Sequence, residues 1–181
     1  MRFTPATAAV AFAVAPSAAF AVDYLDADQA VKLMFPDADH VESRELTLDA
    51  AQLKQLATHG VQARSVRWPV RVVQRGGASL GVVVVDDVVG KFELITYAVG
   101  IDVDGAVKQV EILSYRESHG QEIRLPAWRR QFVGKTAASP LHVGDDISSI
   151  SGATLSCTHV TDGVKRIVAV VHLARREGKL P

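Results

Sequence analysis

The stretch that decides the fold is L-G-V-V-V-V-D-D-V-V-G, residues 80–90. Valine is β-branched and favours extended backbone, and a nearly continuous valine run is typical of a strand that is covered on both faces. The run therefore predicts a buried strand from Leu80 to Val89 that ends at a turn around Gly90.

Strand-forming segments flank this run on both sides, and short turns join them. Residues 66–74 precede it, separated by a turn at residues 75–78 that contains two glycines able to accept positive φ. Residues 92–103 and 107–115 follow it, joined by Asp104-Gly105. Connections this short place consecutive strands side by side in opposite directions, so the sequence predicts an antiparallel meander.

Helical segments lie on either side of the predicted meander. Asp26 or Asp28 can cap a short helix that Pro36 ends, with a stripe of Ala30, Leu33 and Met34, and Asp49 opens a second helix that ends at Gly60. Residues 40–48 between them alternate like a half-buried strand. Aliphatic residues recur at helical spacing from Cys157 to Val171. The predicted fold class is α+β, an antiparallel meander packed with helices and ending in an amphipathic helix.

The composition restricts the classes of function. The 181 residues are 48% hydrophobic, enough for one core, and 20 Lys and Arg balance 20 Asp and Glu. This balance leaves no excess of positive charge to bind phosphates, so nucleic acid is not an expected partner. The single cysteine, Cys157, excludes an internal disulfide and a C-x-x-C pair. The six histidines show no metal-ligand spacing, so no metal site is expected.

The N-terminal segment differs from the rest of the chain. After Arg2 no charge occurs before Asp23, and Ala19-Phe20-Ala21 has the A-x-A pattern of a cleavage site. Residues 1–21 therefore predict a signal peptide and export to the periplasm or the outer face of the cytoplasmic membrane. An uncleaved membrane anchor is the alternative, because the segment approaches bilayer-spanning length. Residues 22–65 then form an N-terminal extension, and residues 66–181 the main domain.

The second informative stretch is S-S-I-S-G-A-T-L-S-C-T, residues 148–158. Thr154 lies just before the predicted last helix, where unpaired backbone N–H groups and the helix dipole favour an anion such as phosphate. Gly152 and Ala153 keep the backbone accessible, and neighbouring serines offer hydroxyl donors. The simpler alternative is that Ser156 or Thr158 caps the helix, with Ser151 and Gly152 as ordinary loop residues. The residues alone favour this alternative, because hydroxyl-rich helix entries are very common.

A resemblance bears on this choice. Three segments resemble those of the FMN-binding domain family, which includes the FMN-carrying C subunit of the sodium-translocating NADH:quinone reductase and the G subunit of the Rnf complex. They are S-G-A-T-L-S (151–156), Y-R-E-S-H-G-Q-E-I (115–123) and W-R-R-Q-F-V-G-K (128–135). The resemblance implies that Thr154 carries FMN through a phosphoester. A flavin transferase that uses FAD as donor would attach it outside the cytoplasm.

The resemblance also implies a set of cofactor-binding residues within residues 66–181. The expected set is Thr154 as the covalent attachment point, with Ser151, Gly152, Ala153, Leu155, Ser156, Glu117, His119, Gly120 and Glu122. It implies an exported flavoprotein that passes electrons to protein partners in a periplasmic or membrane-associated redox chain, rather than a stand-alone enzyme. The alternatives are a secreted small-ligand binding module without redox activity and a flavin-dependent reductase of a small acceptor. No G-x-G-x-x-G segment indicates an NAD(P)H site.

Overall fold

The computed structural model describes residues 22–181, and the predicted signal peptide lies outside them. The elements are β1 (Val22–Asp23), α1 (Ala27–Met34), β2 (His40–Thr47), α2 (Ala50–Thr58), β3 (Arg67–Arg75), β4 (Ala78–Val89), β5 (Leu94–Asp102), β6 (Val107–Tyr115), the 3-10 helix η1 (Gln121–Arg124), α3 (Pro126–Arg129), the 3-10 helix η2 (Arg130–Phe132) and α4 (Thr154–Arg176). The predicted α+β class is confirmed.

The strands form one antiparallel sheet in the order β1-β6-β5-β4-β3-β2. Strands β2 to β6 are neighbours in chain order, which confirms the predicted meander, and β1 adds to the free edge of β6. Both outer strands come from residues before 66, so the predicted N-terminal extension supplies the two edges of the sheet. The division of the chain at residue 66 stays a prediction.

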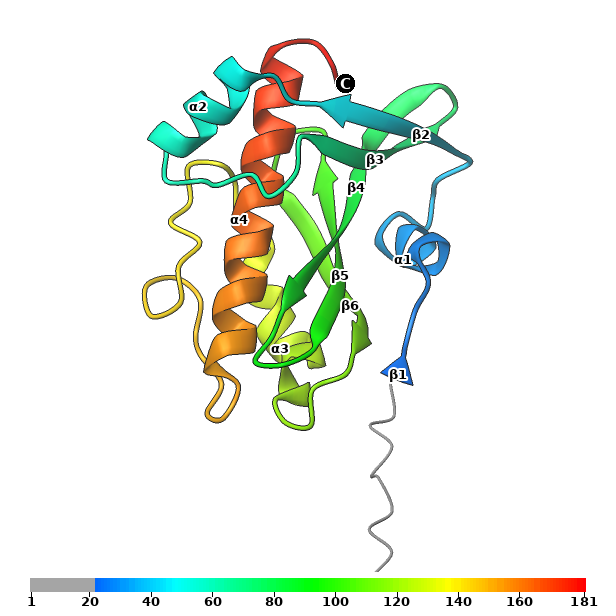
Figure 1. Cartoon of the computed structure of the whole chain (residues 1–181). Helices are drawn as coiled ribbons and strands as arrows, with labels where there is room; N and C mark the ends of the chain where they lie inside the picture. Colours follow the sequence, from blue (N-terminus) through cyan, green and yellow to red (C-terminus); the bar gives the residue numbers. More distant parts are fainter. Residues whose placement is uncertain (1–21) are drawn as a thin grey trace, which may run out of the picture.

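Helices cover both faces of the sheet, as Figure 1 shows: α4 runs across one face and α1 lies on the other. Strand β4 explains the valine run, because Val82 and Val84 belong to the larger core beneath α4 while Val83 belongs to the smaller core beneath α1. Gly100 lets α1 approach the second face, since a Cβ there would lie 2.9 Å from the Met34 sulfur.

The two N-terminal helices begin at the predicted aspartates. Asp26 and Asp49 each form a capping box with the glutamine three residues later. The predicted stripe of α1 is partly wrong, because Leu33 is exposed and Val31 is buried in its place. Strand β2 is not half-buried, since Leu46 is its one fully buried residue. It is an edge strand, so one side of its backbone and most of its side chains face solvent.

Helix α4 is the longest element, with 23 residues, and its buried face carries most of the larger core. It begins at Thr154, earlier than the apolar periodicity from Cys157 indicates. Within residues 22–181, no helix combines the length and apolar character that crossing a membrane requires.

Candidate functional site

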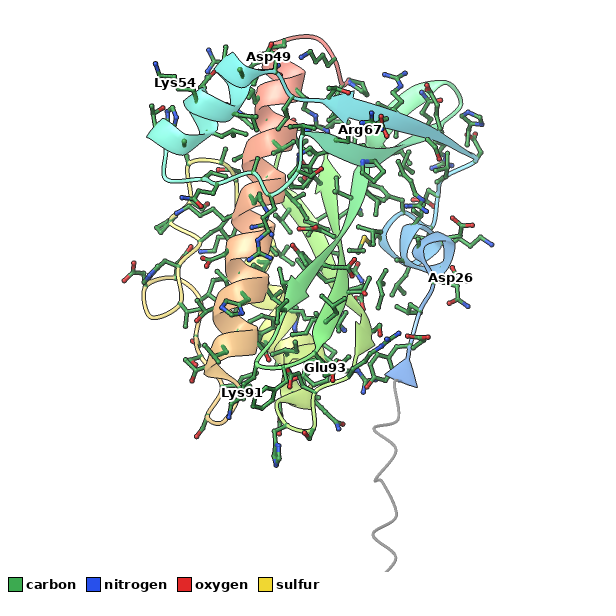
Figure 2. All side chains as sticks on the ribbon, viewed as in Figure 1. Asp26, Asp49, Lys54, Arg67, Lys91 and Glu93 are labelled. Atoms are coloured by element: carbon green, nitrogen blue, oxygen red, sulfur yellow. The ribbon has the colours of Figure 1, made fainter. Side chains whose placement is uncertain are left out.

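A pocket of about 350 Å³ lies where α4 begins. Three segments line it: the β4–β5 turn with Lys91 and Phe92, the loop after β6 with residues 117–119, and residues 152–156. Figure 2 shows Lys91 and Glu93 at the end of the molecule where α4 starts. The fold thus brings two of the segments predicted from the sequence to one place and adds a third, the β4–β5 turn.

Thr154 is the first helical residue of α4, and its side chain is exposed. The N-cap is Ala153, which has no side chain able to bond the helix end, so the first backbone N–H groups lack a side-chain acceptor. The alternative in which Ser156 or Thr158 caps the helix is therefore wrong, because both lie inside it. Gly152 adopts φ of +81°, a left-handed conformation that turns the loop into the helix.

Glu117 holds the β4–β5 turn at the rim of the pocket. One of its carboxylate oxygens, Oε1, accepts hydrogen bonds from the backbone N–H groups of Lys91, Phe92 (2.6 Å) and Glu93 (3.0 Å). Burial alone would raise the pKa of Glu117, but these three backbone donors outweigh it and lower the pKa below its usual value. The side chain is a buried structural carboxylate, and not a solvated one.

A second side chain holds the same turn from the helix. The Nδ1 of His159 in α4 lies 2.5 Å from the carbonyl oxygen of Val89 and 3.1 Å from that of Gly90. Because a carbonyl oxygen can only accept, the imidazole N–H donates. Glu117 and His159 together hold the turn that carries Phe92 at the pocket that Thr154 also lines.

The loop after β6 packs directly against the turn before α4. The Tyr115 hydroxyl donates to the His119 carbonyl and lies 3.3 Å from Ser156 Oγ. Gly120 has φ of +88°, and a Cβ there would lie 2.6 Å from the Ala153 Cβ. Ser156 is buried at the base of the pocket lining, where its hydroxyl lies against Tyr115.

The segment 128–135 anchors the loop that leads into the site. Trp128 Nε1 donates to the Ser148 carbonyl at 2.8 Å, and the Ser148 N–H donates to Gln131 Oε1 at 2.8 Å. Lys135 forms a 2.9 Å ion pair with Asp146. Trp128 and Phe132 are buried and pack edge to face, with ring centroids 5.1 Å apart. Their role is therefore in the core, as helical spacing of aromatic residues usually indicates.

The predicted cofactor residues divide into two adjoining groups. Gly152, Ala153, Thr154, Leu155, Ser156, Glu117 and His119 line the main pocket. Ser151, Gly120 and Glu122 line a smaller hollow beside it, to which Gly152 and His119 also belong. That these residues bind a cofactor stays a prediction. Within residues 22–181, no group of three or more His, Cys, Asp or Glu side chains converges to hold a metal ion.

Sequence reasoning missed Lys91, Phe92, Ser118 and His159. The available signal was Phe92, a large aromatic residue next to a glycine turn, where small polar residues are usual. It is 74% exposed, the highest value among the large hydrophobic residues of the described chain.

Comparison with known proteins identifies the domain that contains this pocket. Residues 90–169 match the model of the FMN-binding domain family. This part of the chain belongs to that family. All pocket-lining residues fall inside the matched range. The FMN-binding domain thus includes the last strands of the meander, the anchoring segment and most of α4.

Two solved structures are similar to the chain. NqrC of Shewanella oneidensis aligns with a TM-score of 0.52 and 17% identity over 74% of this chain and 80% of its own. The corresponding protein of the Na(+)-translocating NADH-quinone reductase from Parabacteroides distasonis ATCC 8503 aligns with a TM-score of 0.46 and 14% identity, covering 79% and 85%. At such identity the likeness to NqrC concerns the fold. A comparison with curated proteins found no match.

The residues of the pocket fit an FMN group. An exposed hydroxyl, unpaired N–H groups at a helix start and a small glycine-alanine turn are suited to a phosphate. Phe92 and Leu155, 74% and 46% exposed, offer apolar surface to a planar ring.

Proposed function

We propose that this chain is an exported electron-transfer flavoprotein that carries FMN through a phosphoester at Thr154. The observation that carries the proposal is the position of the Thr154 hydroxyl. It is exposed at an uncapped helix start, beside a pocket in an FMN-binding domain. The FMN phosphate would rest on the backbone N–H groups of the first turn, where the helix dipole contributes roughly 0.3–1 kcal/mol.

The attachment step uses FAD as the donor and requires a flavin transferase. The Thr154 hydroxyl oxygen bonds to the phosphorus on the FMN side of the FAD pyrophosphate, and the bond to the bridging oxygen breaks. AMP leaves with that oxygen, and the hydroxyl proton is released. The proposal assigns proton removal to the transferase.

The protein's part in electron transfer is to position the ring and set its surroundings. FMN when bound can exchange one or two electrons. Phe92 and Leu155 provide apolar walls, and Lys91, whose ammonium lies 4.9 Å from the Phe92 ring centroid, places a positive charge at the same rim. Phe92, on the β4–β5 turn, is 74% exposed, so we place the approach of a redox partner on this side of the pocket.

Location outside the cytoplasm is part of the proposal and rests on residues 1–21. Fractionation of cells that express the full chain tests it, together with the N-terminal mass of the product. A periplasmic protein that begins at Val22 is the expected result. A protein that retains Met1 in the cytoplasmic fraction would contradict the proposal.

The decisive experiment measures the mass of the peptide that contains Thr154 after co-expression with a flavin transferase. We expect the added mass of one FMN, and yellow colour that stays with the denatured polypeptide. Thr154→Val should abolish both, while Thr158→Val, the matched change one turn later in α4, should leave both intact. An unmodified peptide in the wild-type protein would refute the covalent link.

Electron transfer is tested on the flavin-loaded protein. We expect the reduced protein to pass electrons rapidly to a membrane fraction or a one-electron acceptor protein and to turn over small soluble acceptors only slowly. Fast turnover of a small acceptor by the purified protein would favour the reductase alternative instead.

A further inference from the structure

A second pocket, of about 270 Å³, lies between α2, the loop after residue 135 and the C-terminal half of α4. Figure 1 shows α2 beside this half of α4. The buried side chains of Leu56, Val61, Leu141 and Leu173 form its apolar floor. Ala169 lines it as well, and lies roughly 22 Å along α4 from Thr154 at about 1.5 Å per residue. The pocket is therefore separate from the candidate flavin site.

The ionisable side chains that line this pocket are all basic. Lys165 and Arg176 bring positive charges, His59 and His172 bring imidazoles, and no Asp or Glu lines the pocket. The whole chain has 20 Lys and Arg against 20 Asp and Glu, so a lining without carboxylates does not follow from composition. This asymmetry makes the pocket complementary to an anion.

The two charged side chains are available to a ligand. Within residues 22–181, neither Lys165 nor Arg176 forms a side-chain hydrogen bond or ion pair. The neighbouring Arg175 is engaged instead, because it donates to the carbonyls of Pro181 and Asp102, each at 2.7 Å. Arg176 could serve only to complement the dipole at the helix C-terminus, but Lys165 lies in the middle of α4, where the dipole gives no such reason.

We propose that this second pocket binds a small organic anion with an apolar body, of the aryl-alkyl carboxylate class. The apolar body covers the leucine and valine floor, and the carboxylate pairs with one of the two cations, Lys165 or Arg176, which lie roughly 16 Å apart along α4 at about 1.5 Å per residue. Burial of the body removes apolar surface from water, and charge-assisted hydrogen bonds orient the head group. An inorganic anion leaves the floor uncovered, and a neutral apolar molecule leaves the cations without a partner. The inference does not depend on flavin attachment.

Titration calorimetry with two matched probes tests the proposal on the full-length protein. The probes are 4-phenylbutyrate and 4-phenylbutan-1-ol, which share the apolar body and differ in charge. We expect one-to-one binding of the carboxylate, about tenfold or more tighter than the alcohol. Lys165→Gln combined with Arg176→Gln should remove that difference. Lys54→Gln, a charge on α2 outside the pocket lining and labelled in Figure 2, should preserve it.

A pocket-filling variant checks the location. Ala169→Phe should abolish carboxylate binding, while Ala51→Phe on the exposed face of α2 should not change it. Circular dichroism and thermal melting of each variant show that the fold is kept. Equal affinity for the two probes, no saturable binding of the carboxylate, or unchanged binding by a folded Ala169→Phe protein would each overturn the proposal.

Discussion

The buried carboxylate of Glu117 accepts a 2.6 Å hydrogen bond from the backbone N–H of Phe92. One residue in the loop after β6 thereby positions the exposed aromatic ring at the rim of the FMN-domain pocket. The same oxygen also accepts hydrogen bonds from the backbone N–H groups of Lys91 and Glu93. Together these bonds hold the turn in one backbone conformation. The glutamate acts on the site through the turn.

Glu117→Gln should lower stability near neutral pH and weaken its pH dependence in acid. The pKa of Glu117 is lowered below its ordinary value of 4.5. The charged side chain therefore contributes to the unfolding free energy above that pH, and this contribution is lost as the pH falls through the folded-state pKa. Hydrogen bonds to a charged acceptor contribute roughly 1.5–3 kcal/mol, which sets the scale of the expected loss. Urea unfolding from pH 3 to pH 7 measures it.

Glu93→Gln is the control for that series, because its side chain is exposed and forms no hydrogen bond within residues 22–181. It should leave the unfolding free energy almost unchanged. If Glu117→Gln showed the same stability as wild type at pH 7, the carboxylate would not hold the turn as described.

Trp128→Phe should impair flavin attachment more than it impairs stability. The change removes the 2.8 Å bond from the indole to the Ser148 carbonyl, which fixes the loop before Thr154. Trp68→Phe is a matched control, because Trp68 is equally buried and its indole donates to the Ser65 carbonyl at 2.9 Å, on a different part of the fold. Both variants should lose about 0.5–1.5 kcal/mol of unfolding free energy.

The two tryptophan variants are compared by the fraction of protein that carries FMN after co-expression with a flavin transferase. Only Trp128→Phe should show a reduced fraction. An equal reduction in both variants would mean that general stability, and not loop position, controls attachment.

Much of the fold could be predicted because local signals agreed with the tertiary contacts. The residues of β6 were predicted in full, and the caps at Asp26 and Asp49 lie where acidic side chains precede apolar periodicity. The exposure of Leu33 and β2 could not be predicted, since it depends on which neighbour covers a face. The start of α4 was missed because Ala153 carries no capping group to indicate it.

The candidate site was predictable only where its residues are consecutive. The segment 151–156 and the loop 117–122 carry distinctive local patterns. Phe92 is noticeable by sequence only as a large aromatic residue beside a glycine turn, and His159 is an ordinary helix residue. Both join the site through pairing of β4 with β5 and packing of α4 on the sheet. Such long-range proximity leaves no mark in a single sequence.

Gly120→Ala should separate the loop after β6 from the turn before α4. A Cβ at Gly120 would lie 2.6 Å from the Ala153 Cβ and 2.7 Å from the Tyr115 hydroxyl, and φ of +88° disfavours any side chain. The left-handed backbone conformation alone costs alanine at this position about 1–2 kcal/mol. Gly134→Ala is the matched control, because Gly134 has φ of +79° and nothing within 4 Å of the added atom.

The difference in unfolding free energy between these two alanine variants isolates the effect of the contact between Gly120 and Ala153. Chemical denaturation should show a larger loss for Gly120→Ala, and the flavin-loaded fraction should fall for this variant alone. If both variants showed the same unfolding free energy and the same flavin-loaded fraction, the contact between the loop and the turn would not stabilise the site.

Gly163→Ala should destabilise the protein although alanine favours helices. Gly163 lies inside α4, where alanine is ordinarily better by about 1 kcal/mol. Here its Cβ would lie 2.0 Å from the Tyr97 hydroxyl, which donates to Asp86, the partner of the buried Arg166. We expect a net loss of about 1–3 kcal/mol, the usual range for overpacking. In the Tyr97→Phe background the same change should cost less, because the closest atom is gone, although the ring carbon at 2.7 Å still opposes it. A double-mutant cycle of urea unfolding measures this coupling, and additive single-variant effects would contradict a close approach of α4 to Tyr97.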